Sequence, residues 1–274
     1  MKVRKNIGAI LANMVAWIVV LVFMFPIYYI VSSAFKTPIQ TYSYPPVWFF
    51  RPVLDNFVVA LKDLNVLSYM KNSLIVATIS TVVCMVVSYP AAYGIVRMKS
   101  AARNRIAYLF LIMQSIPTIS VVIAFFFIAR DIGWLDTRKL LIVAYLYWNI
   151  AYAVWQLRGF ISGIPVEIEE AAYVDGCSRF MIPFRITLPL AAQGIIATAI
   201  FVFITAWNEF VFAFFLTFTE AQTIPLTTSL FMTHTEILWG PMFATATLAC
   251  APVVVFVLLV RNYFVGALTY GAIK

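Results

Sequence analysis

The sequence contains very little charge. Only 11% of its 274 residues are Asp, Glu, Lys or Arg, whereas 64% are hydrophobic. An average soluble domain carries about a quarter charged residues, so water is not the main solvent of this chain. The shortage of charge excludes an ordinary globular protein and indicates an integral membrane protein.

The few charged residues leave long gaps between them. A helix that crosses about 30 Å of hydrocarbon needs about 20 apolar residues, and six uncharged runs of 18 to 30 residues reach or nearly reach this length. We therefore predict an all-α integral membrane protein with six transmembrane helices, forming a single polytopic domain over residues 1–274. The runs lie between Lys5 and Lys36, Lys71 and Arg97, Arg105 and Arg130, Lys139 and Arg158, Arg185 and Glu209, and Glu236 and Arg261.

The first run follows Lys2, Arg4 and Lys5, as the apolar core of a signal peptide would. Such a core has about 7–15 residues, whereas this run has 30. We interpret it as a membrane span, with cleavage as the alternative.

Lysine and arginine are unequally shared between the two sides of the predicted bundle. An even number of spans places both termini on one side, and the side richer in Lys and Arg is cytoplasmic. Both termini and the 97–105 and 158–188 loops carry twelve of these residues, against seven opposite. We predict a multi-pass membrane protein with both termini cytoplasmic. The net charge of +8 then reflects contact with phospholipid, and a nucleic-acid partner is unnecessary.

Reactive and metal-binding residues are scarce. The chain has one histidine, His234, and three cysteines, so we predict no metal site. The phosphate-binding pattern G-x-x-x-x-G-K-[S/T] is absent, and we predict a non-catalytic chain that does not hydrolyse ATP. A stand-alone secondary transporter or a membrane enzyme is the alternative, although Glu209 is the only acidic candidate for ion coupling.

The loop at 165–189 is charged and interrupted by glycine, unlike the rest of the chain. Pro165 suits a first helical turn, and three glutamates follow it near the positive end of the helix dipole. We predict a helix from about Pro165 to Asp175, with Ile168, Ala171, Ala172 and Asp175 on one face and Glu170 opposite. Gly176 is a natural C-terminal cap, and Ser178 can cap a second short helix. The alternative interpretation is an interfacial helix that lies on lipid headgroups.

The spacing within this loop resembles a known motif. It has the form EAA-x3-G-x9-I-x-LP, which resembles the "EAA" loop of ABC importer permeases. The segments FPIYYIVSSAFK, TAWNEFVFA and RNYFVGALTYGAIK are also similar to the maltose-type sugar permeases of that family. One departure is Pro183, where an aromatic residue is more common, so the path of the second short helix stays open. The motif positions are Glu170, Ala171, Ala172, Gly176, Ile186, Leu188 and Pro189.

The resemblance implies a type I ABC importer permease fold, a location in a bacterial or archaeal plasma membrane, and a set of partners. The 165–189 loop would be a coupling helix that docks into a cleft on a cytoplasmic ATPase subunit. The chain would bind no cofactor itself, and ATP and Mg would bind to two ATPase subunits. A second permease subunit, forming a heterodimer, and an extracytoplasmic sugar-binding protein would complete the system, whose substrate the sequence does not name.

Two further groups of residues are candidates for function. Asn208 and Glu209, with the neighbouring Trp207, are candidates for the translocation path, because polar residues inside spans are often functional. A hydrogen bond between Glu209 and a neighbouring span, and packing of the aromatic residues, are the alternatives. The tail contains Gly266, Gly271 and Lys274 and would be a poor helix if unsupported. The resemblance implies that it contacts the ATPase subunits; an interfacial tail is the alternative.

Overall fold

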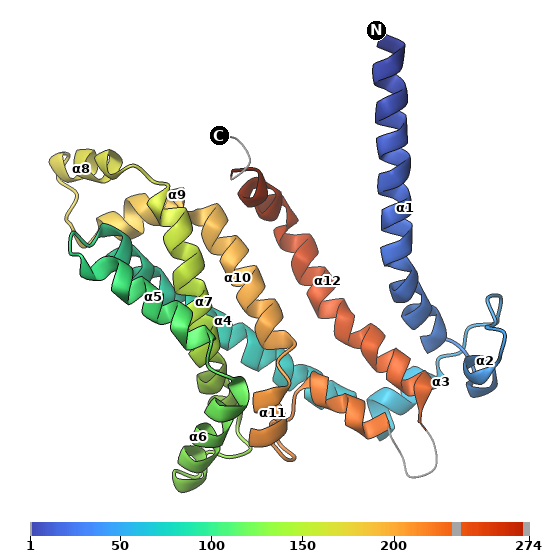
Figure 1. The fold of residues 1–274 in the computed structure, drawn as a ribbon. Coiled ribbons are helices and arrows are strands. Elements are labelled where there is room, and N and C mark those ends of the chain that lie inside the picture. The colour runs from blue at the N-terminus through green and yellow to red at the C-terminus, as the bar shows by residue number, and fades with distance from the viewer. Residues whose placement is uncertain (1, 232–236, 271–274) are drawn as a thin grey trace. The chain divides into compact units, whose positions relative to one another are not determined.

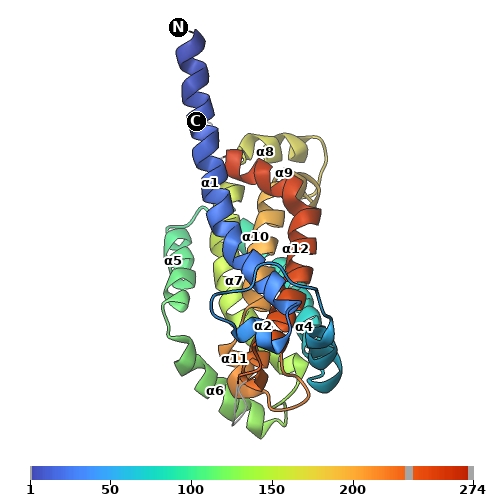
Figure 2. The same cartoon turned by 90° about the vertical axis from the view of Figure 1, so that its right-hand side faces the viewer.

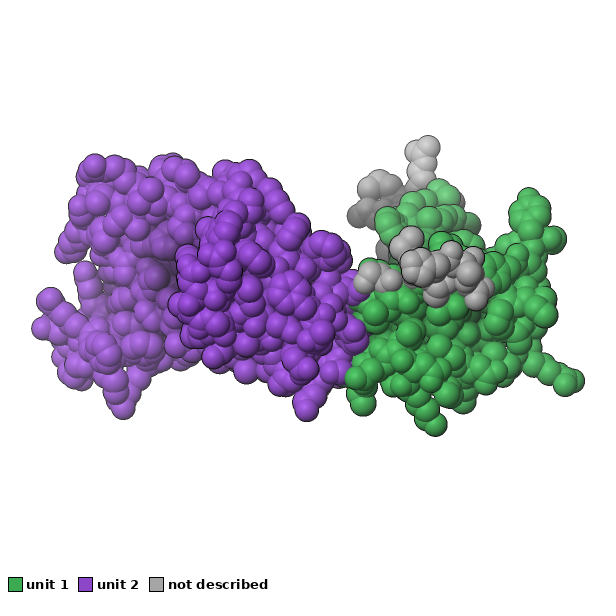
Figure 3. Space-filling view, turned by 90° about the horizontal axis from the view of Figure 1, so that it is seen from below, with its two compact units in different colours: residues 1–67, 227–252 green, residues 68–226, 253–274 purple. Residues whose placement is uncertain are grey.

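All regular elements in the described part of the chain are helices. The computed structural model describes residues 2–231 and 237–270, with side chains for 11–228, 230–231 and 237–258. These residues pack as two compact units, which Figure 3 shows in different colours. Unit 1 comprises residues 1–67 and 227–252, and unit 2 comprises residues 68–226 and 253–274.

Unit 1 begins with α1 (Lys2–Ala34), followed by α2 (Pro38–Tyr42), α3 (Asp55–Val58) and the π-helix η1 (Val59–Asp63). The 3-10 helix η3 (Ile224–Phe231) and α12 (Trp239–Tyr270) each lie partly in it. The buried side chain of Asn56 donates hydrogen bonds to the carbonyl oxygens of Ala34 and Lys36, at 2.9 and 2.8 Å. These bonds satisfy backbone acceptors that the end of α1 leaves open.

Unit 2 contains most of α4 and the elements that follow it in the chain. They are α4 (Val66–Arg97), α5 (Ala102–Gln114), α6 (Thr118–Asp131), α7 (Arg138–Ser162), α8 (Val166–Val174), the π-helix η2 (Pro183–Thr187), α9 (Leu188–Leu190), α10 (Ala192–Trp207) and α11 (Val211–Leu216). Within this unit α8 lies at one end, and α6 and α11 lie at the other (Figures 1 and 2).

The described residues contain four to six candidate membrane spans, against the six predicted. In the part of the chain that the structure describes, four helices are long and apolar enough to cross a membrane: α1, α4, α7 and α12. The other two spans are helix pairs, in which α5 and α6 are bent by 86° and the Pro183–Leu190 segment and α10 by 76°. Pro117 stands at the first break, where it cannot donate a helical hydrogen bond. The chain therefore has six spans if each bent pair crosses once.

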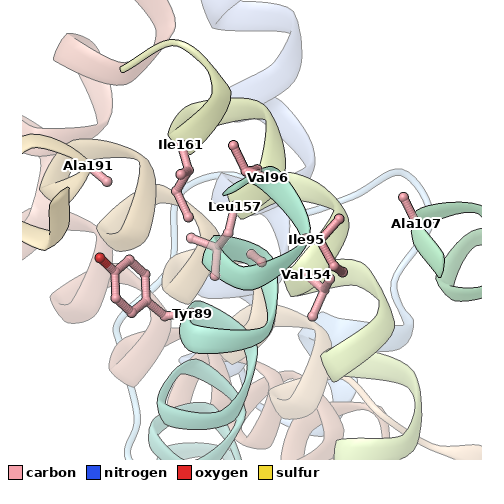
Figure 4. Packing of buried hydrophobic residues seen from close by; sticks show 9 residues of the cluster. Tyr89, Ile95, Val96, Ala107, Val154, Leu157, Ile161 and Ala191 are labelled. Carbon is pink, nitrogen blue, oxygen red and sulfur yellow. The ribbon is translucent and has the colours of Figure 1, made fainter. Parts of the chain in front are cut away.

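The core of unit 2 joins α4 to α7. Ala92, Ile95 and Val96 of α4 are buried against Val154, Leu157 and Ile161 of α7 (Figure 4). A further cluster places Cys84 of α4 beside Ala153 of α7 and Val202 of α10. Small residues allow these helices to approach closely, as is usual in membrane bundles.

Gly194 of α10 lies tightly against Phe160 of α7. A Cβ atom at this position would lie 2.2 Å from Cγ of Phe160. The Phe160 ring would have to move out of its packed position to admit even one methyl group.

We predict that Gly194→Ala destabilises the chain by about 1–3 kcal/mol, because overpacking forces side chains and backbone to shift. Gly159→Ala, on α7, is the matched control, since nothing lies within 4 Å of a Cβ atom there. It should be neutral or stabilise by up to about 1 kcal/mol. Thermal unfolding of the detergent-solubilised chain measures both, and equal unfolding temperatures for the two variants would contradict the assignment.

Candidate functional site

The predicted helix of the 165–189 loop is confirmed. α8 runs from Val166 to Val174, with Pro165 before its first turn and Asp175 at its C-cap. Gly176 follows at φ +90°, a conformation that side chains disfavour. The N–H of Gly176 bonds to the Tyr173 carbonyl at 3.1 Å, and the N–H of Cys177 bonds to the Ala172 carbonyl at 3.0 Å. This pair of bonds is a Schellman motif, so Gly176 ends the helix as predicted.

The predicted motif residues of α8 face outwards. Glu170, Ala171 and Gly176 are exposed, and Ala172 is half-buried. Tyr173 and Val174 are also exposed, at 50% and 84%. Ile168 and Ala171, two residues of the predicted shared face, are exposed, and the buried residue of α8 is Glu169. α8 therefore presents the motif residues on an open surface.

Glu169 holds α8 to the rest of unit 2 through a buried ion pair. Arg97, at the end of α4, donates from Nη2 to Oε1 of Glu169 at 2.8 Å and from Nε to both carboxylate oxygens at 3.1 Å. Tyr93 donates to Oε2 at 2.9 Å, and Thr187 of η2 donates to Oε1 at 2.7 Å. One carboxylate thus joins α4, α8 and η2.

The surroundings of Glu169 keep it ionised. Burial alone would raise the pKa of its carboxyl, but hydrogen bonds from Arg97, Thr187 and Tyr93 outweigh burial and hold the pKa below its usual range. A carboxylate with this many donors is strongly favoured over the protonated acid. The network is therefore intact at neutral pH.

Sequence reasoning did not identify Glu169 or Arg97 as functional residues. Glu169 is one of three glutamates within four residues, and its burial depends on where α4 lies. A signal was nevertheless present, because Arg97 ends an uncharged run of 25 residues and such a charge often finds a buried partner.

The second half of the loop is a continuous helical path. η2 begins at Pro183, so the departure from the family pattern falls at the first position of a helix, where proline is tolerated. Ser178 starts a turn through its backbone carbonyl, which accepts from Met181 at 2.9 Å, and the predicted side-chain cap is replaced by this turn. Ile186 is half-buried, and Leu188 and Pro189 are exposed. Pro189 and Ile168 line a groove of about 420 Å³.

The three candidates for the translocation path separate into two environments. Trp207 is 3% exposed and stacks on Phe203, with ring centroids 6.0 Å apart. In this structure the Trp207 side chain packs within the protein, which agrees with the alternative interpretation that the aromatic residues serve packing. Asn208 is exposed, and the Glu209 carboxylate accepts hydrogen bonds from the backbone N–H groups of Phe212 and Ala213 at 3.0 and 3.3 Å. Glu209 thus caps the start of α11.

Asn208 and Glu209 line a pocket of about 430 Å³ with residues of α6 and α7. Trp148 and Tyr145 supply aromatic rings to its wall, and Asn149 supplies an amide. Asn149 is 2% exposed, and its Oδ1 atom has no hydrogen-bond partner among the described residues. A buried acceptor of this kind is costly unless something donates to it.

The remaining candidates lie at the C-terminus. α12 continues through Gly266 to Tyr270, and the expectation that the tail is a poor helix when unsupported stays a prediction. Gly271 and Lys274 lie outside the described residues. In the described part of the chain, no three His, Cys, Asp or Glu side chains are grouped to hold a metal ion, and His234 lies outside that part.

Comparison with known proteins identifies the family. The profile of the family described as "Binding-protein-dependent transport system inner membrane component" matches residues 84–269. The chain is 36% identical over 273 residues to the trehalose/maltose transport system permease protein MalG of Thermococcus litoralis, covering 98% of this chain and 95% of that one. It is 32% identical to the diacetylchitobiose uptake system permease protein DasC of Streptomyces coelicolor, covering 99% of both.

Solved structures show the same fold. A chain of a bacterial ABC transporter involved in the import of the acidic polysaccharide alginate matches with a TM-score of 0.76 and 19% identity, covering 95% of this chain and 97% of that one. A chain of the MetNI methionine ABC transporter matches with a TM-score of 0.58 and 16% identity, covering 74% and 96%. The predicted ABC importer permease fold is confirmed.

The chain belongs to the binding-protein-dependent transport system inner membrane component family. It is a permease subunit of the ABC importer class, and the stand-alone transporter or enzyme is not favoured. The 165–189 loop falls within the matched region.

We predict that Glu169→Gln destabilises the chain by about 1.5–3 kcal/mol at pH 7, because it weakens charged hydrogen bonds in a buried network. The folded pKa of Glu169 is lowered, so its stabilisation is fully present above the unfolded pKa of about 4.3 and is lost as pH falls through the folded value.

Thermal unfolding in detergent at pH 7 and through the acid range measures this effect. Glu167→Gln, at an exposed position of the same helix, is the control and should match the parent chain. The deficit of Glu169→Gln should shrink at acid pH, and a deficit independent of pH would contradict the role of the charge.

Proposed function

We propose that the chain is one of two permease subunits of an ATP-driven sugar importer, and that α8 couples it to an ATPase subunit. The observation that supports this most is the pairing of an exposed motif face with a buried anchor. Glu170 and Ala171 are open to a partner, while Glu169 on the same helix is bonded to Arg97. A force applied to α8 would reach α4 and η2 through that anchor.

The ATP-hydrolysing partners follow from the chemistry that this chain lacks. Its sequence has no phosphate-binding loop of the P-loop type, so two ATPase subunits would bind the ATP and Mg. Closure of those subunits would carry α8 with it and rock the attached spans as rigid bodies between two states. Ala172 and Gly176 would lie at the joint, with Glu170 at its rim, and Ile186, Leu188 and Pro189 would lead back to the membrane.

The sugar and the remaining partners are proposed from the relatives. MalG and DasC are named for trehalose/maltose and diacetylchitobiose transport, and a similar solved transporter is in complex with a periplasmic protein that carries an alginate pentasaccharide. We infer a second permease and an extracytoplasmic sugar-binding protein. The most apolar window of Leu11–Ala34 has no buried residue in the structure, which leaves α1 free for lipid or the second permease.

The pocket beside Glu209 fits a path for sugar hydroxyl groups. Asn149 offers a buried amide oxygen to which no described group donates, Asn208 offers a second amide, and Trp148 offers an aromatic surface. Sites for polar ligands commonly combine apolar walls with a few placed polar groups. Trp207, which is adjacent to Asn208 in the chain and stacks on Phe203, would have a packing role.

The location and the tail complete the proposal. Both termini would be cytoplasmic, because the side that carries the 97–105 loop and α8 is the richer in Lys and Arg. The tail, with Gly266, Gly271 and Lys274, would contact the ATPase subunits on that side.

We predict that Ala171→Arg abolishes sugar uptake while the chain still inserts and folds. A charge buried without a partner at a docking surface costs several kcal/mol, whereas Ala171 is exposed in the chain itself. Uptake and co-purification of the ATPase subunits are measured together. Ile39→Arg, at a position 84% exposed on the opposite predicted side, is the control and should retain both; normal uptake by Ala171→Arg would refute the docking proposal.

We also predict the orientation of the chain. With the three native cysteines replaced by alanine, a cysteine at Ala101 should react only with cytoplasmic reagent and one at Ile39 only with external reagent. Both positions are exposed, so accessibility depends on the side of the membrane alone. Labelling of position 101 from outside intact cells would overturn the orientation.

A further inference from the structure

One stripe of α4 holds the coupling loop at three points. Tyr89, Tyr93 and Arg97 are spaced four residues apart and therefore share one face of the helix. Tyr89 donates to the carbonyl oxygen of Pro183, Tyr93 donates to Glu169, and Arg97 bonds to Glu169 and to the carbonyl oxygen of Ile164 at 3.0 Å. We name these contacts the loop clamp.

The opposite end of α4 holds a second segment in a similar way. Asn72 donates to the carbonyl oxygens of Glu220 and Gln222, both at 2.9 Å. Ser73 accepts from the N–H of Ile224 at 2.8 Å, and Tyr69 donates to the side chain of Gln222 at 3.1 Å. We name these contacts the far clamp and residues 217–224 the strap. The two clamps lie roughly 30 Å apart, given about 1.5 Å per residue between Asn72 and Tyr93.

The strap is also fixed to the start of α7. Asp136 accepts backbone hydrogen bonds from the four consecutive residues 218–221, at 3.0 to 3.2 Å, and one from the Thr219 hydroxyl at 2.8 Å. It adopts φ 57°, which Asp tolerates better than most residues. Arg138, two residues later, donates to Oδ1 of Asn72 at 2.7 Å. The far clamp thus ties α4, α7 and the strap together.

α4 and α7 are therefore joined at both ends and packed in between. Arg138 bonds to Asn72 at the far end, and Arg97 bonds to the carbonyl of Ile164, just beyond α7, at the loop end. Between them the two helices share the buried core shown in Figure 4. Packed interiors transmit displacement as bodies because they deform little.

We propose that α4 and α7 form a strut that moves the strap whenever the coupling loop moves. The strap begins where α11 ends, and α11 is the helix that Glu209 caps beside the pocket. Movement of the strap would therefore reach the wall of the translocation pocket. The proposal rests on the proposed function only for the source of movement, which is the ATPase docked on α8.

Hydrogen exchange of the importer purified with its own ATPase subunits, with and without ATP and Mg²⁺, tests the strut. In the parent protein we expect ATP to change exchange both in residues 164–190 and in the strap. Glu169→Gln weakens the loop clamp, and Asn72→Asp removes the two donated bonds of the far clamp while keeping an acceptor for Arg138. Each variant should lose the ATP-dependent change in the strap, and the double variant should show no further loss.

Two control variants test whether a substitution on the same helices but outside the clamps also removes the response of the strap. Ser80→Ala removes only bonds within α4, from the Ser80 hydroxyl to the carbonyl oxygens of Val76 and Ala77, and Glu167→Gln changes an exposed acid of α8. Both should keep the response of the strap. If Asn72→Asp does not fold, Tyr69→Phe removes a single bond of the same clamp.

The outcomes distinguish the strut from the proposed function. A strap that still responds to ATP in both clamp variants overturns the strut, as does a parent protein in which only residues 164–190 respond. A parent protein in which residues 164–190 do not respond overturns the docking of the ATPase on this loop, and the strut with it.

Discussion

The ion pair between Glu169 and Arg97 is the interaction on which the functional end of the chain depends. It is buried, it brings together α4, α8 and η2, and each carboxylate oxygen has more than one donor. Buried ion pairs often add little net stability compared with apolar packing, but breaking one partner is costly. The pair is best understood as a device that fixes the position of α8. A helix of nine residues would not hold a defined orientation at the membrane surface without such an anchor.

The membrane explains why polar networks gather at the helix ends in this chain. Hydrocarbon cannot satisfy a polar group, so side chains such as Ser80 and Thr81 in the middle of α4 bond back to their own helix. Near the two ends, Asn72 and Arg97 instead reach other segments. The polar side chains in the middle of α4 therefore bond within the helix, and those near its two ends bond to other segments.

Much of this arrangement could be predicted from the sequence. The spacing of charges predicted six spans, and α8 with its glycine cap followed from Pro165, the glutamates and Gly176. Local chemistry was sufficient to predict α8 because the proline, the glutamates and the glycine each act on backbone groups within a few residues of them. The bends were not predicted: Pro117 permits a kink, but the angle depends on how α5 packs against α7 and α6 against α11. The roles of Glu169 and Trp207 were likewise decided by packing, since single-helix geometry cannot tell which side a neighbour will cover.

The Glu169–Arg97 pair also has a consequence for biogenesis. Its partners are separated by 72 residues in the chain, so Arg97 leaves the ribosome well before Glu169 is made. At about 5–20 residues per second, several seconds pass in which α4 has entered the membrane with an unpaired guanidinium at its end. During that time the long basic side chain of Arg97 can extend to the lipid headgroups and remain solvated there. Once α8 has been synthesised, Arg97 leaves the lipid headgroups and pairs with Glu169. The coupling loop therefore reaches its bonded position only after the fourth span has been made.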